Sequence, residues 1–262
     1  MAHRLAAVFA HPDDDTFGLA GTLALNPDCE YTVIVATSGD AGMISEPTLA
    51  TKENLGEVRE HEERNALAAV GKSDANIHFL RYPDMGLAEA PRDELVAKVM
   101  DLLIEAGPEV VVTFGPEGVT GHSDHVTIGE VATTAFHDAR GRAGPGQFQR
   151  LFYNSVAQSD LDLFYGFARQ AGIDVGNPGD PFRPRGVPDE TIAVRIDCSS
   201  VIDRKLEAIR AHATQSNELQ GLPDELVKAM FSREYFVRAW PQRGSAEGPG
   251  SDLFEGLDEK PA

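Results

Sequence analysis

The sequence predicts an α/β protein in which helices cover both faces of a mostly parallel β-sheet. In the first half of the chain, short and continuously apolar segments alternate with longer amphipathic ones. Apolar runs of this length are typical of strands that are buried on both faces. Strands that alternate with helices form parallel sheets, because each crossover helix returns the chain to the same end of the sheet.

Four strands and four helices are expected in this first half. The apolar runs place strands at residues 5–10, 31–39, 77–82 and 109–114. Helices are expected at residues 16–25, 51–70 and 92–106, and from Ser123 or Asp124 to about Arg140. Gly71 is suited to end the second helix, and Ser123 or Asp124 can cap the start of the fourth.

The second half is less regular, and we expect an irregular C-terminal portion there. Strands are predicted at residues 150–156 and 191–196, helices at 200–214 and 224–233, and a long Gly- and Pro-rich loop at 172–188. Residues 242–262 are polar and contain Gly and Pro, so we expect a flexible tail. Residues 1–241 are expected to form one domain.

The charge balance excludes two classes of partner. With 42 acidic and 23 basic residues, the net charge is −19, and such a surface repels nucleic acid and anionic membranes. No apolar run is long enough for a membrane helix. The two cysteines, Cys29 and Cys198, form no disulfide framework and fit a cytoplasmic protein. A homo-oligomer is possible, because the sequence does not indicate the oligomeric state.

Acidic residues are crowded where the first strand ends. Residues 10–15 read AHPDDD, and ligands of open α/β sheets bind beyond the carboxyl ends of strands. Carboxylates gathered there repel one another, and a bound divalent cation would relieve the repulsion. The alternative is a solvated acidic turn, which this motif alone does not exclude.

A second polar loop follows the strand at residues 109–114. It contains His122 and His125, whose spacing places both on one face of a helical turn. If the two strands are neighbours in a parallel sheet, both loops open at the same end. A His and an Asp from one loop and a His from the other make three metal ligands with a fourth position open, which is the arrangement of catalytic zinc.

These motifs resemble those of a known enzyme family. AHPDDD resembles the AHPDD(E/D) motif of the LmbE-like, or PIG-L, N-deacetylases, and GHSDH at residues 121–125 resembles their later H-x-D-H motif. Weaker similarities occur at residues 37–42, 59–71, 82–87 and 205–215. The resemblance implies a Rossmann-like fold, usually with zinc, and activity on N-acetylglucosaminyl groups or on mycothiol-type amides.

The resemblance also implies residue roles. The metal ligands would be His11, Asp14 and His125, and Asp13 would be the general base. His122 would stabilise the oxyanion as an imidazolium, and Asp124 would orient or charge that imidazole.

Two further positions match residues of the family that contact sugar hydroxyls, namely Arg59 and Asp84. For Arg59 the alternative is a solvated helix face, and for Asp84 it is a turn-forming role. His212 and Gln215 match the family's late motif and either contact substrate or form a polar helix edge. Asp15 is expected to support the first loop by hydrogen bonding.

The leading hypothesis is therefore a zinc-dependent hydrolase that removes an acetyl or other acyl group from the amide nitrogen of a small N-acetylglucosaminyl-type substrate. Iron(II), cobalt or nickel would suit the same ligands. The alternatives are an amidase acting on a larger thiol–sugar conjugate and a non-catalytic metal-binding protein of Rossmann-like fold. A nucleotide-binding protein is disfavoured, since His-Pro-Asp-Asp replaces the Gly-rich phosphate loop.

Overall fold

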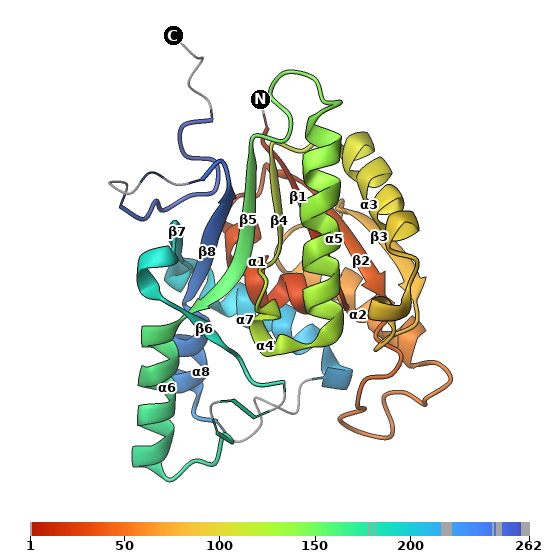
Figure 1. Ribbon diagram of the computed structural model, residues 1–262. Coiled ribbons are helices and arrows are strands. Elements are labelled where there is room, and N and C mark those ends of the chain that lie inside the picture. The colour runs from red at the N-terminus through yellow and green to blue at the C-terminus, as the bar shows by residue number, and fades with distance from the viewer. Residues whose placement is uncertain are drawn as a thin grey trace.

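The computed structural model describes residues 2–177, 179–180, 182–215, 222–242, 244 and 248–257. Within these residues the chain forms an eight-stranded sheet with the order β3-β2-β1-β4-β5-β8-β7, and β6 pairs with β5 (Figure 1). The strands are β1 Arg4–Phe9, β2 Glu30–Thr37, β3 Asn76–Tyr82, β4 Val110–Phe114, β5 Arg150–Ala157, β6 Gly186–Val187, β7 Val194–Asp197 and β8 Arg233–Trp240.

Most of the sheet is parallel, as the sequence predicts. β1 pairs in parallel with both β2 and β4, and β2–β3, β4–β5 and β5–β6 are parallel pairs as well. β8 runs antiparallel to β5 and to β7, so the irregular C-terminal portion completes one edge of the sheet. The predicted fold class is confirmed.

Helices cover both faces of the sheet. Their bounds are α1 Asp14–Leu25, α2 Leu55–Ala69, α3 Arg92–Ala106, α4 Gly118–Gly121, α5 Ser123–Arg140, α6 Gln158–Ala171, α7 Ile202–Ala211 and α8 Asp224–Phe231. Short 3-10 turns lie at Leu87–Glu89, Asp189–Thr191 and Ser199–Val201. In Figure 1, α3 and α5 pack together on one face, whereas α1, α2 and α7 pack together on the other.

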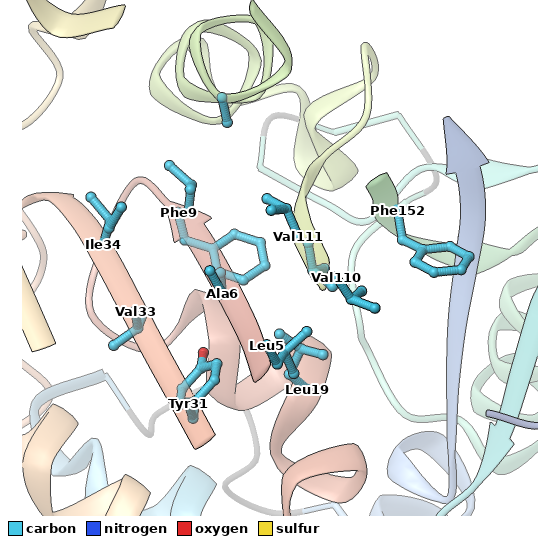
Figure 2. Packing of buried hydrophobic residues seen from close by; sticks show 14 of the residues in the cluster. Leu5, Ala6, Phe9, Leu19, Tyr31, Val33, Ile34, Val110, Val111 and Phe152 are labelled. Carbon is cyan, nitrogen blue, oxygen red and sulfur yellow. The ribbon is translucent and has the colours of Figure 1, made fainter. Parts of the chain in front are cut away.

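The core is centred on β1, because this strand has a neighbour on each side and helices on both faces. From Leu5 to Phe9, each residue of β1 is at most 2% exposed. Figure 2 shows side chains of β1, β2 and β4 packed against one another in this layer. Because both faces of β1 are covered, every residue from Leu5 to Phe9 is apolar, which accounts for the continuous apolar run at the start of the sequence.

Several elements differ from the sequence-based expectation, among them β6, which lies within the predicted loop at residues 172–188, and α4, which lies within the polar loop after β4. α6 and β8 are not predicted, since α6 buries only Ala168 and β8 carries charged residues among its apolar ones. α2 begins at Leu55 rather than at residue 51.

The segment expected to be a flexible tail is partly packed against the core. Leu253 is fully buried, Phe254 stacks on the ring of His3, and Arg150 donates a hydrogen bond to the carbonyl of Leu253. Leu253 and Phe254 pack against the core because they are apolar. The segment as a whole is polar, so its composition does not predict this packing. Residues 243, 245–247 and 258–262 of that tail lie outside the described residues. We propose that residues 1–241 form one domain, since a single large hydrophobic cluster includes residues from β1 through β8.

No helix in the described part of the chain is long and apolar enough to cross a bilayer.

A buried ion pair joins α1, α7 and β8. Lys205 Nζ lies 2.7 Å from Glu234 Oε1, and both side chains are about 1% exposed. Glu234 also accepts hydrogen bonds from the backbone N–H groups of Gly21 and Thr22. The Glu234 carboxylate therefore pairs with the buried ammonium of α7 and accepts hydrogen bonds from two backbone N–H groups of α1.

We expect Glu234→Ala to lower the free energy of unfolding by about 3–5 kcal/mol, because it leaves a buried ammonium unpaired. Glu207→Ala, which removes an exposed carboxylate from α7, should change it by less than about 0.5 kcal/mol. Urea denaturation of both variants measures the difference. Equal effects of the two substitutions would contradict this role for Glu234.

Candidate active site and metal centre

The two polar loops meet at the carboxyl edge of the sheet. β1 and β4 are parallel neighbours, with Leu5 opposite Val110, so the loops that follow them open at the same end. The strand order also reverses here, because β2 and β3 lie on one side of β1 and β4 and β5 on the other. Such a switch point is where open α/β sheets bind their ligands.

Three side chains bring donor atoms close together at this point. His11 Nδ1 lies 3.2 Å from His125 Nε2 and 3.6 Å from Asp14 Oδ2, and His125 Nε2 lies 3.3 Å from Asp14 Oδ1. Ligands of a tetrahedral zinc ion at 2.0–2.1 Å are separated by roughly 3.3 Å. The separations therefore fit a single ion held by these three residues.

The other ring nitrogen of each histidine lies close to an oxygen atom of the protein. His125 Nδ1 lies 3.0 Å from the carbonyl oxygen of Gly118, so Nε2 is the ring nitrogen that could bind a metal, and the ring stacks on Phe114. His11 Nε2 lies 3.1 Å from Asp84 Oδ1 and 3.6 Å from Asp124 Oδ2. A carboxylate behind a ligating histidine fixes the orientation of the ring and raises its basicity.

Two other groups of potential ligands overlap with this set. The donor atoms of His11, His122 and His125, and likewise those of His11, Asp84 and Asp124, lie within 4.8 Å of one another. Asp84 and Asp124 both face the outer nitrogen of His11, Nε2, at 3.1 and 3.6 Å. In the His11–Asp14–His125 set, every pair of residues has donor atoms 3.2–3.6 Å apart, and each ring contributes one nitrogen. The distances thus favour it as the ligand set, with Asp84 and Asp124 behind His11.

The charges of these groups depend on one another. Burial lowers the pKa of His11, but the nearby carboxylates of Asp124, Asp14 and Asp84 outweigh this effect and raise it well above its usual value. Burial raises the pKa of Asp14, but His125 and His11 outweigh that effect and hold it well below its usual range. The lowered pKa favours the ionised carboxylate, which is the form that binds metal ions.

Asp13 lies at the N-terminus of α1 with an unusual backbone. Its φ of 103° and ψ of −27° place it in the left-handed region. Its Oδ2 accepts a hydrogen bond of 3.0 Å from Arg59 Nη2. Burial raises the pKa of Asp13 to about 7, although the Arg59 guanidinium lowers it. A carboxylate with a pKa near neutrality is suited to accept and release a proton.

His122 and Asp124 lie in the second loop, but Asp124 does not act on His122 as expected. Its carboxylate accepts hydrogen bonds from the N–H groups of Met85 and Leu87 and faces His11 instead. The backbone N–H of Asp124, not its side chain, donates to His122 Nδ1 at 3.1 Å. Nδ1 is therefore an acceptor, which makes Nε2 the protonated nitrogen of a neutral imidazole. The expected imidazolium is not favoured, since burial and the neighbouring His11 and His125 lower the pKa of His122.

Arg59 and Asp84, the expected sugar contacts, are both engaged within the protein. Arg59 is 4% exposed and donates to the carbonyls of Gly39 and Pro12 as well as to Asp13. Asp84 Oδ2 accepts from the N–H of Ala41, while Oδ1 faces His11. That either residue contacts sugar stays a prediction.

A layer of buried polar groups supports the first loop from beneath. Asp15 accepts a hydrogen bond of 2.8 Å from the Tyr31 hydroxyl, in line with the expected supporting role. The ring of His212 is 2% exposed, and its Nε2 lies 3.0 Å from Thr16 Oγ1. Gln215 lies outside this layer: it is partly exposed and donates to the carbonyl of Met43 in the loop that follows β2. His212 is thus a buried structural contact in this structure, on the inner side of α1.

The Gly- and Pro-rich loop at residues 172–188 reaches the site, which the sequence did not establish. The ring of Phe182 lies 5.3 Å from that of His122. The Arg185 guanidinium lies against Gly121, where a Cβ atom would approach it to 2.3 Å and displace the end of the Arg185 side chain. Gly121 has a φ of 75°, a backbone conformation that favours glycine. The loop therefore supplies an aromatic ring and a cation beside His122.

The model of the PIG-L family, described as GlcNAc-PI de-N-acetylase, matches residues 6–136, which contain both polar loops. The chain belongs to the PIG-L family. Curated relatives match over nearly their whole length. The 1D-myo-inositol 2-acetamido-2-deoxy-alpha-D-glucopyranoside deacetylase of Geodermatophilus obscurus is 30% identical over 98% of both chains. That of Saccharomonospora viridis is 32% identical over 95% of this chain and 99% of the relative.

Solved structures share the fold of this PIG-L member. The conserved protein TT1542 from Thermus thermophilus is 23% identical, with a TM-score of 0.60 over 92% of this chain and 96% of that one. N,N'-diacetylchitobiose deacetylase from Pyrococcus horikoshii is 20% identical, with a TM-score of 0.58 over 90% and 84%. The hydratase GalB from Pseudomonas putida is 17% identical and reaches 0.61 over 94% and 100%. Since a hydratase shares this fold, the fold alone does not decide the reaction.

Substitution of the ligands tests the metal centre of this PIG-L member. We expect His125→Ala to weaken zinc affinity by more than the roughly 10- to 100-fold that loss of a residue behind a ligand costs. His122→Ala should retain the metal, because His122 is not in the favoured ligand set. Metal content by mass spectrometry and competition with a chromophoric chelator measure both, with the exposed His61→Ala as control. Stoichiometric, tight zinc in His125→Ala would contradict the assignment.

Proposed function

We propose that this protein is a zinc-dependent hydrolase that removes an acetyl group from the amide nitrogen of a small N-acetylglucosaminyl-type substrate. The observation that carries the proposal is the convergence of His11 Nδ1, His125 Nε2 and the Asp14 carboxylate within 3.2–3.6 Å of one another, with Asp13 beside them. Membership of the PIG-L family supports it, as do the curated relatives, which are named deacetylases of a 2-acetamido-2-deoxyglucoside.

The metal would be held by His11, Asp14 and His125. A divalent ion bound there lowers the pKa of a water molecule and polarises the amide carbonyl. Two nitrogen ligands and one carboxylate suit zinc, which is the reason that we propose it over other divalent ions.

Asp13 is proposed as the general base. Of its two carboxylate oxygens, only Oδ2 is engaged among the described residues, by Arg59. Oδ1 is thus available to accept a proton from the attacking water as the new C–O bond forms. When the C–N bond then breaks, Asp13 returns the proton to the departing amine, and acetate is released.

His122 is proposed to stabilise the charge on the carbonyl oxygen. Its Nδ1 is occupied by the N–H of Asp124, so Nε2–H is the donor left for the oxyanion. A donor fixed in this way before the reaction stabilises charge without reorganising. The ring lies 4.8 Å from that of His11 and 5.0 Å from that of His125, close to the proposed ion.

The substrate is proposed to be a small amide in the cytoplasm rather than a nucleic acid or a membrane surface. The net charge of −19 disfavours anionic polymers. Cys29 and Cys198 are buried free thiols, which suits a reducing compartment. Arg59 and Asp84 are retained as proposed sugar contacts, on the family resemblance alone.

The activity is tested by acetate release from N-acetylglucosamine and from an N-acetylglucosaminyl inositol. We expect release that a chelator abolishes and added zinc restores. Absence of release from every N-acyl sugar in a panel, by zinc-loaded folded protein, would contradict the proposed function.

Asp13→Asn tests the base. It should retain zinc and lower kcat by about 100-fold or more, because the amide cannot accept the proton. Asp28→Asn, the same change at an exposed position, should leave kcat unaltered. Full turnover in Asp13→Asn would remove the assignment of the base.

A further inference from the structure

Helix α2 holds both polar groups of one peptide bond in the first loop. Arg59 Nη2 donates a hydrogen bond of 2.6 Å to the carbonyl of Pro12. The N–H of Asp13, at the other side of the same peptide, donates one of 3.1 Å to Glu63 Oε2. Arg59 and Glu63 are four residues apart on α2, so they lie on the same face of the helix. Side chains from two consecutive turns of α2 therefore form hydrogen bonds with both polar groups of the Pro12–Asp13 peptide.

This peptide determines the conformation of Asp13. The φ of Asp13, 103°, is the rotation about the bond from its hydrogen-bonded backbone nitrogen to the Cα that carries the side chain. Residues with a side chain seldom adopt such a φ, and Asp is one of the few types that do so more often. The conformation persists where the surrounding structure constrains the backbone. The two hydrogen bonds from α2 constrain this peptide, because rotation of its plane would move both the carbonyl and the N–H away from their partners.

The two side chains that bind this peptide are buried, so water does not readily replace their hydrogen bonds. Glu63 is fully buried and Arg59 is 4% exposed. If Glu63 lost its acceptor oxygen, the N–H of Asp13 would be left without a partner in the interior, which is unfavourable. Relaxation of the peptide is then the expected response, and the Asp13 carboxylate would move with it.

We propose that Glu63, together with Arg59, is a positioning residue that holds Asp13 in the left-handed conformation from which its carboxylate serves the reaction. The inference rests on the proposed function in one respect, namely that Asp13 is the base. It adds a residue that neither the two loop motifs nor the comparisons assign. The proposal also assigns Arg59 a role in positioning Asp13 that does not depend on contact with sugar.

A purely structural role is the competing explanation, because Glu63 also lies beside the buried carboxyl of Asp15. Two substitutions separate the roles. Glu63→Gln keeps an acceptor oxygen for the Asp13 N–H, whereas Glu63→Met has similar length and no acceptor. In a structural role the two variants would differ in stability, with no specific loss of kcat.

The kinetic test compares these variants in the full-length, zinc-loaded protein. We expect Glu63→Met to lower kcat by about 10- to 100-fold, as a displaced catalytic group does. KM and zinc affinity should be retained, and Glu63→Gln should restore most of kcat. Glu57→Met, the same change at an exposed position of the same helix, is the matched control and should keep kcat. Wild-type kcat in Glu63→Met, or an equal loss in Glu63→Gln, would overturn the proposal.

A crystal structure of each variant gives a readout that does not depend on activity. We expect Asp13 to keep its positive φ in Glu63→Gln and to move to negative φ in Glu63→Met. If Glu63→Met does not fold, Glu63→Ala takes its place in both experiments. An unchanged Asp13 in the variant without an acceptor would overturn the proposal, whereas full activity of Asp13→Asn would remove only the base assignment.

Discussion

In the centre of the sheet, β1 and β4 pair in parallel, and the rest of the site depends on this contact. The pairing places two loops, more than 100 residues apart in the chain, side by side at the carboxyl edge of the sheet. One loop supplies His11 and Asp14 and the other supplies His125. Because both strands are buried within the core, the two loops start from rigid positions. A catalytic constellation needs such support if its atoms are to stay within reach of one another.

The electrostatics of the site follow from this enforced proximity. Asp13, Asp14 and Asp124 lie close to His11 and His125 in a largely buried region, where unbalanced charge is costly. Imidazoles whose outer nitrogens face a carbonyl or carboxylate oxygen, with a carboxylate between the rings, form a ready ligand set for a divalent cation. Burial in this region raises the pKa of Asp13 to about 7, where a proton acceptor is most useful. Folding thus maintains an arrangement that the isolated loops would not adopt.

The sequence predicts those features that depend on local pattern. The continuous apolar run of β1 indicates a central strand, and His11, Asp14 and His125 stand out because they follow two such runs. β8 could not be predicted in the same way, since it is antiparallel and charged residues interrupt its apolar ones. Asp84 lies in a turn whose sequence indicates a turn only, and its contact with His11 spans 73 residues. The role of Glu63 is likewise invisible, because a Glu on a helix is ordinarily exposed until the fold buries it.

The proposed chemistry requires that His11, Asp14 and His125 share one ion at the switch point of the sheet. Anomalous diffraction at the zinc edge, from crystals of the zinc-loaded protein, tests this requirement directly. We expect a single strong peak about 2.0–2.2 Å from His11 Nδ1, His125 Nε2 and an Asp14 oxygen, with a further position open to solvent. A peak elsewhere in the molecule, or none at these three atoms in fully loaded protein, would contradict the shared site.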